Sequence, residues 1–350
     1  MANRISHVSP EQTLLLAECS LQAYNPTDQV TPPSGYKLIG SWTGEDASSI
    51  FGDNNPNYGL IFQNESQTDE YIFAFRGTAD WEELFIDAFF NEATFHPHAN
   101  DVSANQATIA TGFWDIYSEA TGNGGPSMQD QLFTWMEQLK PATLYITGHS
   151  LGSALAELFN LDLALSLPAS SLPSTINHYN FACPRVGKST FSGLYAEKVP
   201  NEVIRFVNYW DFVPFLPPST LLKYKHATDY FLLAFYEKGA WVVHPTVRHS
   251  MFNYQQVLTK AVAAPNQIYI GDVTGLDNVT LKSVQPPQSE LSTEELDAFR
   301  QKAHPALYPN PSIGEVEDHE DGKDKKGCSL MSAALLLVVV LFVWLLAFVN

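Results

Sequence analysis

The chain has 350 residues, of which 45% are hydrophobic, enough to fill the core of one large domain or two small ones. Its formal net charge of −19 and the lack of a basic cluster argue against a nucleic acid as a partner. The three cysteines are widely spaced, and the sequence contains no C-x-x-C, Walker A, G-x-G-x-x-G or H-E-x-x-H pattern. We therefore expect neither a cofactor nor a metal site.

The N-terminal part of the sequence predicts one helix followed by strands. Residues from Ser9 to Tyr24 have the pattern of a capped amphipathic helix. Turn-forming residues dominate positions 31–59, where we expect only a short strand around Tyr36 to Ile39. The stretches from Tyr58 to Phe62 and from Glu70 to Phe75 are predicted to be strands.

Three helices are predicted before the next strand. The first is predicted from Ala79 to Phe90. Acidic residues occupy the face opposite its apolar residues, so this pattern alone predicts a surface helix packed on the core. Its apolar residues are spaced at i, i+3, i+4 and i+7, and they are Trp81, Leu84, Phe85 and Ala88. The other two run from Thr108 to Ala120 and from Ser127 to Leu139. The glycine-rich stretch between them lacks the lysine of a phosphate-binding loop and is interpreted as a linker.

The stretch from Ala142 to Leu158 has the pattern of a strand, a G-x-S-x-G motif and a helix. This context is that of a nucleophile elbow, in which the serine lies at the apex of a strained turn, at the positive end of the following helix. Gly148 and Gly152 of the motif lack a Cβ atom and let strand and helix pass close to each other. We therefore predict that Ser150 is a nucleophile and that His149 only packs beside the elbow.

Strands and helices alternate after the elbow. Strands are predicted at His178 to Ala182, Val203 to Val207, Lys225 to Leu233 and Lys238 to Val243, and a helix at His249 to Ala261. Such alternation predicts a mostly parallel sheet covered by helices. Beyond Pro265 the pattern weakens, and only a short charged helix beginning near Ser292 is expected.

A serine nucleophile needs a histidine base and a carboxylate that orients it, in the chain order Ser, Asp or Glu, His. Asp211 follows the strand that ends at Val207, which would place it at the same sheet edge as Ser150. Asp162 is expected to be a surface or capping residue, and Asp229 lies inside a predicted strand. Asp211 is therefore our candidate for the acid.

The base remains open between two histidines. His226 precedes a predicted strand, whereas His249 begins a predicted helix. A loop-to-helix junction near the end of the fold suits a base that must reach over the serine. The position thus favours His249 and leaves His226 as the alternative.

Five motifs follow one another along the chain. They are Phe75-Arg76-Gly77-Thr78, Gly148-His149-Ser150-Leu151-Gly152, Pro184-Arg185-Val186-Gly187, Asp211-Phe212-Val213-Pro214 with Leu216-Pro217-Pro218, and His249-Ser250-Met251-Phe252-Asn253-Tyr254. With these motifs the chain resembles the fungal-type class 3 lipases, over roughly Tyr58 to Leu258. The resemblance implies an α/β-hydrolase fold with a mostly parallel central sheet. Ser153 departs from it, since a glycine usually follows the serine motif.

The resemblance also implies roles for individual residues. Ser150, Asp211 and His249 would form the catalytic triad, and His226 would be a recurring histidine without a catalytic role. Thr78 and the backbone N–H of Leu151 would form the oxyanion hole. The helix from Ala79 to Phe90 would be a lid, with an apolar face that includes Trp81, Leu84 and Phe85.

These residues predict a serine carboxylic-ester hydrolase that needs no cofactor. We expect a triacylglycerol or acylglycerol lipase of lipid catabolism, acting at a membrane or lipid-droplet surface. A phospholipase A1 or a diacylglycerol-selective lipase is the alternative, because the sequence does not reveal the headgroup pocket. The alternative outside enzymes is a membrane-tethered interaction module with a dead hydrolase fold.

The expected domain organisation has five parts. They are an N-terminal helix and cap segment at 1–57, a lipase-like core at 58–264, an appendage at 265–308, an acidic linker at 309–328 and a transmembrane tail anchor at 329–350. The anchor is predicted because Leu330 to Val349 is almost wholly apolar and uncharged, and about 20 helical residues span a bilayer.

The charges beside this apolar stretch predict its orientation. Lys323, Lys325 and Lys326 precede it, so the positive-inside rule places the catalytic domain in the cytosol. Two N-x-S/T sequons, at Asn64 and Asn278, leave a luminal orientation as the alternative.

Overall fold

The computed structural model describes residues 9–44, 57–78, 91–99, 107–121, 124–208, 211, 213–217, 222–228, 230–236, 248–263, 267–272 and 280–283. The helix predicted from Ala79 to Phe90 and the apolar stretch from Leu330 to Val349 lie outside these residues. Within the described ranges, no helix combines the length and the hydropathy that crossing a membrane requires.

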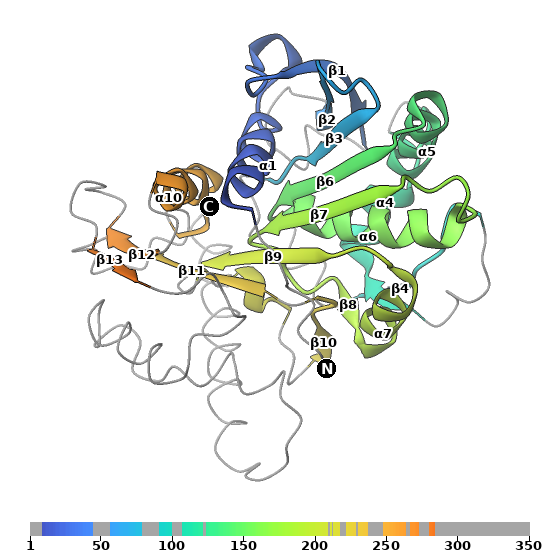
Figure 1. Cartoon of the computed structure of the whole chain (residues 1–350). Coiled ribbons are helices and arrows are strands. Elements are labelled where there is room, and N and C mark those ends of the chain that lie inside the picture. Colours follow the sequence, from blue (N-terminus) through green and yellow to red (C-terminus); the bar gives the residue numbers. More distant parts are fainter. Residues whose placement is uncertain are drawn as a thin grey trace, which may run out of the picture.

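A large sheet forms the centre of the described part of the chain (Figure 1). Its strands, in spatial order, are β1 (Tyr36–Thr43), β2 (Asn57–Asn64), β3 (Glu70–Phe75), β6 (Thr143–His149), β7 (Thr175–Phe181), β9 (Val203–Asn208), β11 (Tyr230–Tyr236), β12 (Gln267–Asp272) and β13 (Thr280–Ser283). The strands from β3 to β12 pair in parallel, while β1, β2 and β13 pair antiparallel with their neighbours. The prediction of a mostly parallel sheet is confirmed.

Helices cover both faces of this sheet. One core contains residues of α1 (Pro10–Gln22) and α10 (Met251–Ala263), which pack against each other. The other core lies under α4 (Thr111–Ser118), α5 (Met128–Leu139), α6 (Leu151–Ser166) and α7 (Ser189–Lys198). Because successive side chains of a strand point to opposite faces, β3 supplies Phe73 and Phe75 to the second core and Ile72 and Ala74 to the first.

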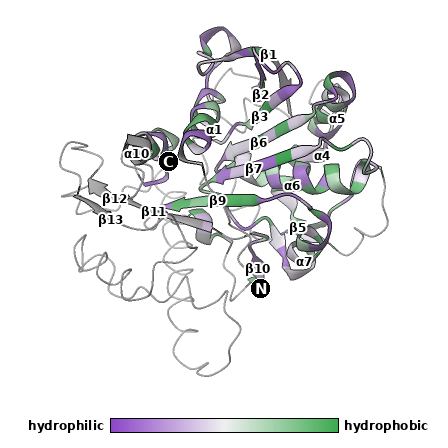
Figure 2. Cartoon of the chain, viewed as in Figure 1, coloured by the Kyte–Doolittle hydropathy of each residue, from purple (hydrophilic) through white to green (hydrophobic). Residues whose placement is uncertain are grey.

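The central strands are buried on both faces, as parallel strands between two helix layers are expected to be. Every residue of β9 is buried, and its hydrophobic character is visible in Figure 2. At the chain's first helix, the predicted cap is present: Ser9 Oγ accepts a hydrogen bond from the backbone N–H of Gln12 at 3.2 Å. The described residues also include two 3-10 turns, η1 (Thr27–Gln29) and η3 (Val213–Phe215).

A second, small sheet includes residues that were predicted to begin a helix. It contains, in spatial order, β10 (Tyr224–Lys225), β8 (Gly187–Lys188), β5 (Thr108–Ala110) and β4 (Glu92–Thr94). The helix predicted from Thr108 begins instead at Thr111, because the preceding residues form β5 and pair with β4 and β8. Thr108 and Ile109 are β-branched and fit a strand better than a helix.

The region after 263 also differs from the expectation. The weak pattern beyond Pro265 predicted no strand, yet β12 lies beside β11 and β13 pairs with β12. The predicted strand from Lys238 to Val243 lies outside the described residues. The late helix begins at Met251, two residues after His249, which itself belongs to a short helical turn.

Candidate active site

The predicted elbow is present between β6 and α6. Ser150 takes φ 55° and ψ −126°, a left-handed backbone conformation that costs a residue with a Cβ atom roughly 1–3 kcal/mol. A Cβ on Gly148 would lie 2.6 Å from the main-chain carbon of Gly152, and a Cβ on Gly152 would lie 2.4 Å from the carbonyl oxygen of Phe75. Both positions therefore need glycine, and their close packing holds the strained turn in place.

Ser150, His249 and Asp211 form one chain of hydrogen bonds. His249 Nε2 lies 2.7 Å from Ser150 Oγ, and His249 Nδ1 lies 2.8 Å from Asp211 Oδ2. The carboxylate can only accept, so Nδ1 carries a proton and Nε2 is left to accept the hydroxyl proton of the serine. The exposed fractions of the three side chains are 4% or less. This arrangement is that of a serine nucleophile with its general base and an orienting carboxylate.

Asp211 is held at the end of β9 by two further donors. Its Oδ1 accepts from the backbone N–H of Val213 at 3.0 Å, and its Oδ2 accepts from Tyr254 Oη at 3.0 Å. Burial raises the pKa of Tyr254 well above its ordinary value, so this phenol remains a donor at neutral pH. Tyr254 also accepts from the backbone N–H of Asn208 at 2.7 Å. No local sequence pattern indicates this role of Tyr254, which lies in α10, 43 residues from its partner.

The structure distinguishes between the two histidines that the sequence left as candidates for the base. His226 lies after β10, and its Nε2 donates to the carbonyl oxygen of Pro214 at 2.7 Å. Burial lowers its pKa well below the ordinary value, and two nearby arginines lower it further. Of these two side chains, it is His249 that lies at hydrogen-bond distance from Ser150.

The two residues predicted for the oxyanion hole lie on either side of the serine. Thr78 is buried and follows β3, whose residue Phe75 is in register with Gly148 of β6. A Cβ on Gly77 would lie 2.5 Å from the carbonyl oxygen of His149, so the segment after β3 lies against the elbow. Leu151 is the first residue of α6, where backbone N–H groups point out of the helix end. The positions suit the predicted role, which stays a prediction.

The residues predicted for the lid, Trp81, Leu84 and Phe85, lie outside the described residues. Among the side chains that the structure does describe, His, Cys, Asp and Glu form no group of three that could hold a metal ion. Cys19 and Cys183 are both buried as free thiols.

The prediction that His149 packs beside the elbow is confirmed, but the ring also makes polar contacts that the sequence does not indicate. It lies against the ring of His249, with centroids 4.6 Å apart. Its Nε2 also makes a hydrogen bond of 2.7 Å to the carbonyl oxygen of His249. The partner lies 100 residues away in sequence, so no local pattern indicates this contact.

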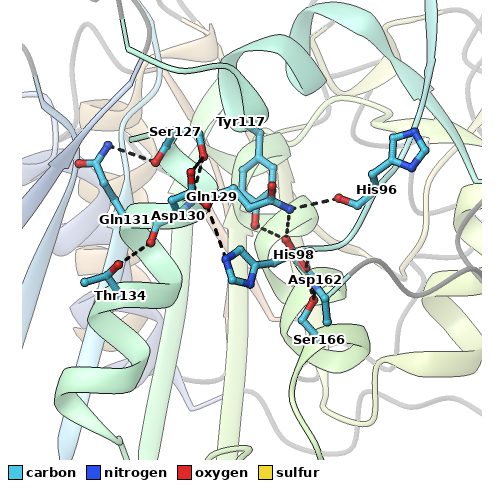
Figure 3. A network of polar contacts seen from close by, with 11 residues as sticks. His96, His98, Tyr117, Ser127, Gln129, Asp130, Gln131, Thr134, Asp162 and Ser166 are labelled. Atoms are coloured by element: carbon cyan, nitrogen blue, oxygen red, sulfur yellow. Dashed lines mark hydrogen bonds and ion pairs between the residues drawn. The ribbon is translucent and has the colours of Figure 1, made fainter. Parts of the chain in front are cut away.

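The expectation for Asp162 is wrong, because this residue of α6 is fully buried. Figure 3 shows its carboxylate at the centre of a polar network. Oδ1 accepts from the backbone N–H of His98 at 2.8 Å and from Ser166 Oγ at 2.6 Å. Oδ2 accepts from Gln129 Nε2 at 2.7 Å and from Tyr117 Oη at 2.9 Å. The carboxylate thereby joins α4, α5 and the segment after β4 to α6, which is a structural role.

A second buried carboxyl group lies on the same helix, between the elbow and Asp162, about two turns after the elbow. Glu157 Oε1 accepts a hydrogen bond of 3.4 Å from Cys183 Sγ. Burial raises the pKa of Glu157 to about 7, against the opposing effects of the Arg205 charge and of hydrogen bonds from Cys183 and Asn180. The sequence does not reveal this group, because a glutamate within a helix is usually exposed.

Comparison with known proteins agrees with this geometry. Residues 72–221 match the family Lipase (class 3). A lipase of Rhizopus niveus is 31% identical over 188 residues, which cover 54% of this chain and 42% of that protein. Phospholipase A1-IIgamma of Arabidopsis thaliana is 29% identical over 168 residues, covering 43% of this chain and 39% of that protein.

A solved structure is similar as well. The Rhizomucor miehei lipase propeptide complex aligns with a TM-score of 0.49 and 23% identity, over 65% of this chain and 70% of that chain. The chain spans about two fifths of the length of these two curated relatives. The family match over residues 72–221 and the Rhizopus niveus relative agree with the predicted resemblance to the fungal-type class 3 lipases.

Proposed function

We propose that the protein is a serine carboxylic-ester hydrolase and that it acts as an acylglycerol lipase in lipid catabolism. The observation that carries the proposal is the 2.7 Å contact between Ser150 Oγ and His249 Nε2 on a strained elbow. A nucleophile and base at this distance, with the base oriented by Asp211, are the requirements of acyl transfer. The class 3 lipase match supports the same reaction.

In this mechanism, Ser150 Oγ attacks the ester carbonyl carbon while His249 Nε2 takes the hydroxyl proton. Asp211 stabilises the imidazolium that forms. The backbone N–H groups at Thr78 and Leu151, together with the Thr78 hydroxyl, bind the oxyanion of the tetrahedral intermediate. His249 then gives its proton to the departing alcohol, which leaves an acyl-enzyme. Water repeats the sequence, with His249 again as base, and releases the fatty acid.

A fluorophosphonate probe tests the reaction type, because it labels a serine only when the serine is activated. The wild-type protein should be labelled at Ser150, and Ser150→Ala should remain unlabelled. A protein with a dead hydrolase fold, which is the alternative outside enzymes, would not react with the probe. Folded wild-type protein that resists labelling over hours would therefore overturn the proposed activity.

The substrate is proposed to be an acylglycerol, with a phospholipid as the second candidate. The Rhizopus niveus match is a lipase, whereas the Arabidopsis match is a phospholipase A1, so both classes occur among the relatives. Incubation of mixed membranes with the protein, followed by lipid profiling, separates them. Loss of tri- or diacylglycerol against the Ser150→Ala control supports the first candidate. Accumulation of 2-acyl lysophospholipid would support the second.

We also propose the lid on the strength of the sequence pattern and the family resemblance. An apolar face that includes Trp81, Leu84 and Phe85 would cover the site in water and bind lipid when open, so a lipid surface would favour the open state. Activity on a short-chain ester should then rise sharply where the substrate begins to aggregate, and Trp81→Ala should reduce this rise. A rate curve that passes smoothly through the aggregation threshold would speak against the lid.

Residues 329–350 are proposed as a membrane anchor that leaves the catalytic domain in the cytosol. The support is the uncharged apolar run from Leu330 to Val349 and the lysines that precede it. Protease added to intact microsomes should digest the catalytic domain, and truncation after Gly314 should release an active enzyme. Protection from the protease, or glycans on Asn64 or Asn278, would require the luminal orientation instead.

A further inference from the structure

His149 connects the nucleophile elbow to the main chain of the base. Its Nε2 lies 2.7 Å from the carbonyl oxygen of His249, and its Nδ1 lies 2.6 Å from Tyr24 Oη. A carbonyl oxygen can only accept a hydrogen bond, so Nε2 must carry a proton. When the ring is neutral, Nδ1 is then an acceptor, and the hydroxyl of Tyr24 donates to it. The two partners thereby select a single tautomer of His149.

The surroundings of His149 favour the neutral ring. Burial lowers its pKa well below the ordinary value, and the neighbouring His249 imidazole lowers it further. Burial also raises the pKa of Tyr24, so its hydroxyl stays a donor. A neutral ring at this position is needed in the proposed mechanism, because His249 becomes positively charged during the reaction. The two rings are only 4.6 Å apart, and a second cation there would oppose that charge.

The hydrogen bond from His149 holds the backbone of His249, not its side chain. His249 Nε2 and Nδ1 are occupied by Ser150 and Asp211, which leaves the ring position dependent on where its main chain lies. The preceding carbonyl, that of Arg248, is held in the same way, since it accepts from Asn208 Nδ2 at 3.0 Å. Side chains of the sheet edge thus hold two consecutive carbonyl groups at the base.

We propose that Tyr24 and His149 are positioning residues that hold the main chain of His249 against the nucleophile elbow and so set the distance between base and nucleophile. The inference rests on the proposed hydrolase function, because it concerns the geometry of that reaction. It makes the turn after α1, in which Tyr24 lies, part of the support of the active site. Errors of about 1 Å in such geometry can cost roughly 10²-fold in rate.

Two substitutions of His149 separate positioning from packing. The amide nitrogen of glutamine reaches the place of Nε2, whereas that of asparagine reaches only the place of Nδ1. His149→Gln should therefore keep kcat within about 3-fold, and His149→Asn should lower kcat by about 10- to 100-fold, with KM changed less than about 2-fold. The substrate is a water-soluble p-nitrophenyl ester, and the melting temperature of each variant is measured in parallel.

Tyr24→Phe removes the donor to Nδ1, and it should lower kcat by about 10-fold. Its matched control is Tyr117→Phe, which removes another buried donor, the hydroxyl that bonds Asp162 Oδ2 at 2.9 Å. This control should lower the melting temperature to a similar degree but leave kcat within about 2-fold. Equal kcat for His149→Gln and His149→Asn, or equal losses of kcat in the two tyrosine variants, would overturn the positioning role.

Labelling by the fluorophosphonate probe distinguishes this failure from failure of the proposed function. If wild-type protein is labelled and the variants are labelled at wild-type rate, the positioning role alone is wrong. If folded wild-type protein is not labelled, the proposed function is wrong, and the positioning role is wrong with it. Slower labelling of His149→Asn and Tyr24→Phe, with His149→Gln and Tyr117→Phe close to wild type, supports the proposal.

Discussion

Tyr254 donates a hydrogen bond of 3.0 Å to Asp211 at Oδ2, the same oxygen that accepts from His249 Nδ1. Two donors on one carboxylate oxygen fix both its position and the direction in which the base must point. The tyrosine is therefore part of the support of the active site.

Tyr254→Phe should lower kcat by about 10-fold, because Asp211 loses one of the donors that orient it. The change also leaves the backbone N–H of Asn208 without the acceptor at 2.7 Å, which should reduce the free energy of unfolding by about 1–3 kcal/mol. Ester hydrolysis and urea unfolding measure the two effects. Tyr195→Phe, which removes a buried hydroxyl next to Asn160, serves as the control. If both variants hydrolysed ester at the wild-type rate, Tyr254 would have no role in orienting the carboxylate.

Ser150→Ala and His249→Ala should each reduce kcat by about 10⁴-fold or more, since the members of such a triad act as a unit. Asp211→Asn should also lower kcat severely, but somewhat less than these two substitutions do. His226→Ala should keep most of the activity, because that ring bonds the carbonyl oxygen of Pro214. Hydrolysis of a soluble ester by folded variants tests all four. An inactive His226→Ala beside an active His249→Ala would reverse the assignment of the base.

Thr78→Val keeps the shape and the backbone N–H of the predicted oxyanion hole but removes the hydroxyl. Loss of one such donor typically costs 10²–10³ in kcat, so we expect a decrease of roughly 10- to 10³-fold with KM little changed. Thr78→Ser retains the hydroxyl and should be tolerated, which makes it the control. A Val variant as active as the Ser variant would leave Thr78 with a purely structural role.

Glu157 should make the stability of the fold depend on pH. Burial raises its pKa from 4.5 to about 7 in the folded state, so the folded protein binds this proton more tightly than the unfolded chain does. The free energy of unfolding should therefore fall as the pH rises from about 4.5 to 7, by roughly 3 kcal/mol from this group, and not recover above 7. Glu157→Gln resembles the protonated form and should remove this decrease.

Urea unfolding at pH 4.5, 6 and 8 measures the effect. The advantage of Glu157→Gln over wild type should be largest at pH 8 and should vanish at pH 4.5. Glu119→Gln, at an exposed position, controls for the loss of one negative charge. The same pH slope in wild type and in Glu157→Gln would show that the buried carboxyl group does not cause it.

The elbow and the sheet were predictable because their signals are local. The strand, the turn and the helix around Ser150 follow one another without a gap, so propensity and the two glycines suffice to locate them. Asp211 was likewise predictable, since the end of a parallel strand fixes the sheet edge at which its loop begins. The choice between His226 and His249 was not settled by residue patterns, because it depends on how two distant loops fold back over the serine.

The contacts of His149 and Asp162 could not be predicted for a related reason. His149 bonds Tyr24, 125 residues away, and Asp162 bonds Gln129 and His98 across three elements. Periodicity records only which face of an element is apolar, and it contains no information about such partners. β5 was predicted as helix and β12 was missed because strands depend largely on their neighbours in the sheet, which a local pattern does not reveal.

The packing of α1 against α10 has a consequence for the synthesis of the chain. The first described helix leaves the ribosome about 240 residues before the last helix of its core, which at 5–20 residues per second is a delay of about 10 to 50 s. During that time Leu16, Ala17, Cys19 and Ala23 lack part of the apolar surface that buries them in the finished fold. The nascent chain therefore exposes apolar side chains to chaperones, and the contact between Ser150 and His249 cannot form before His249 has emerged.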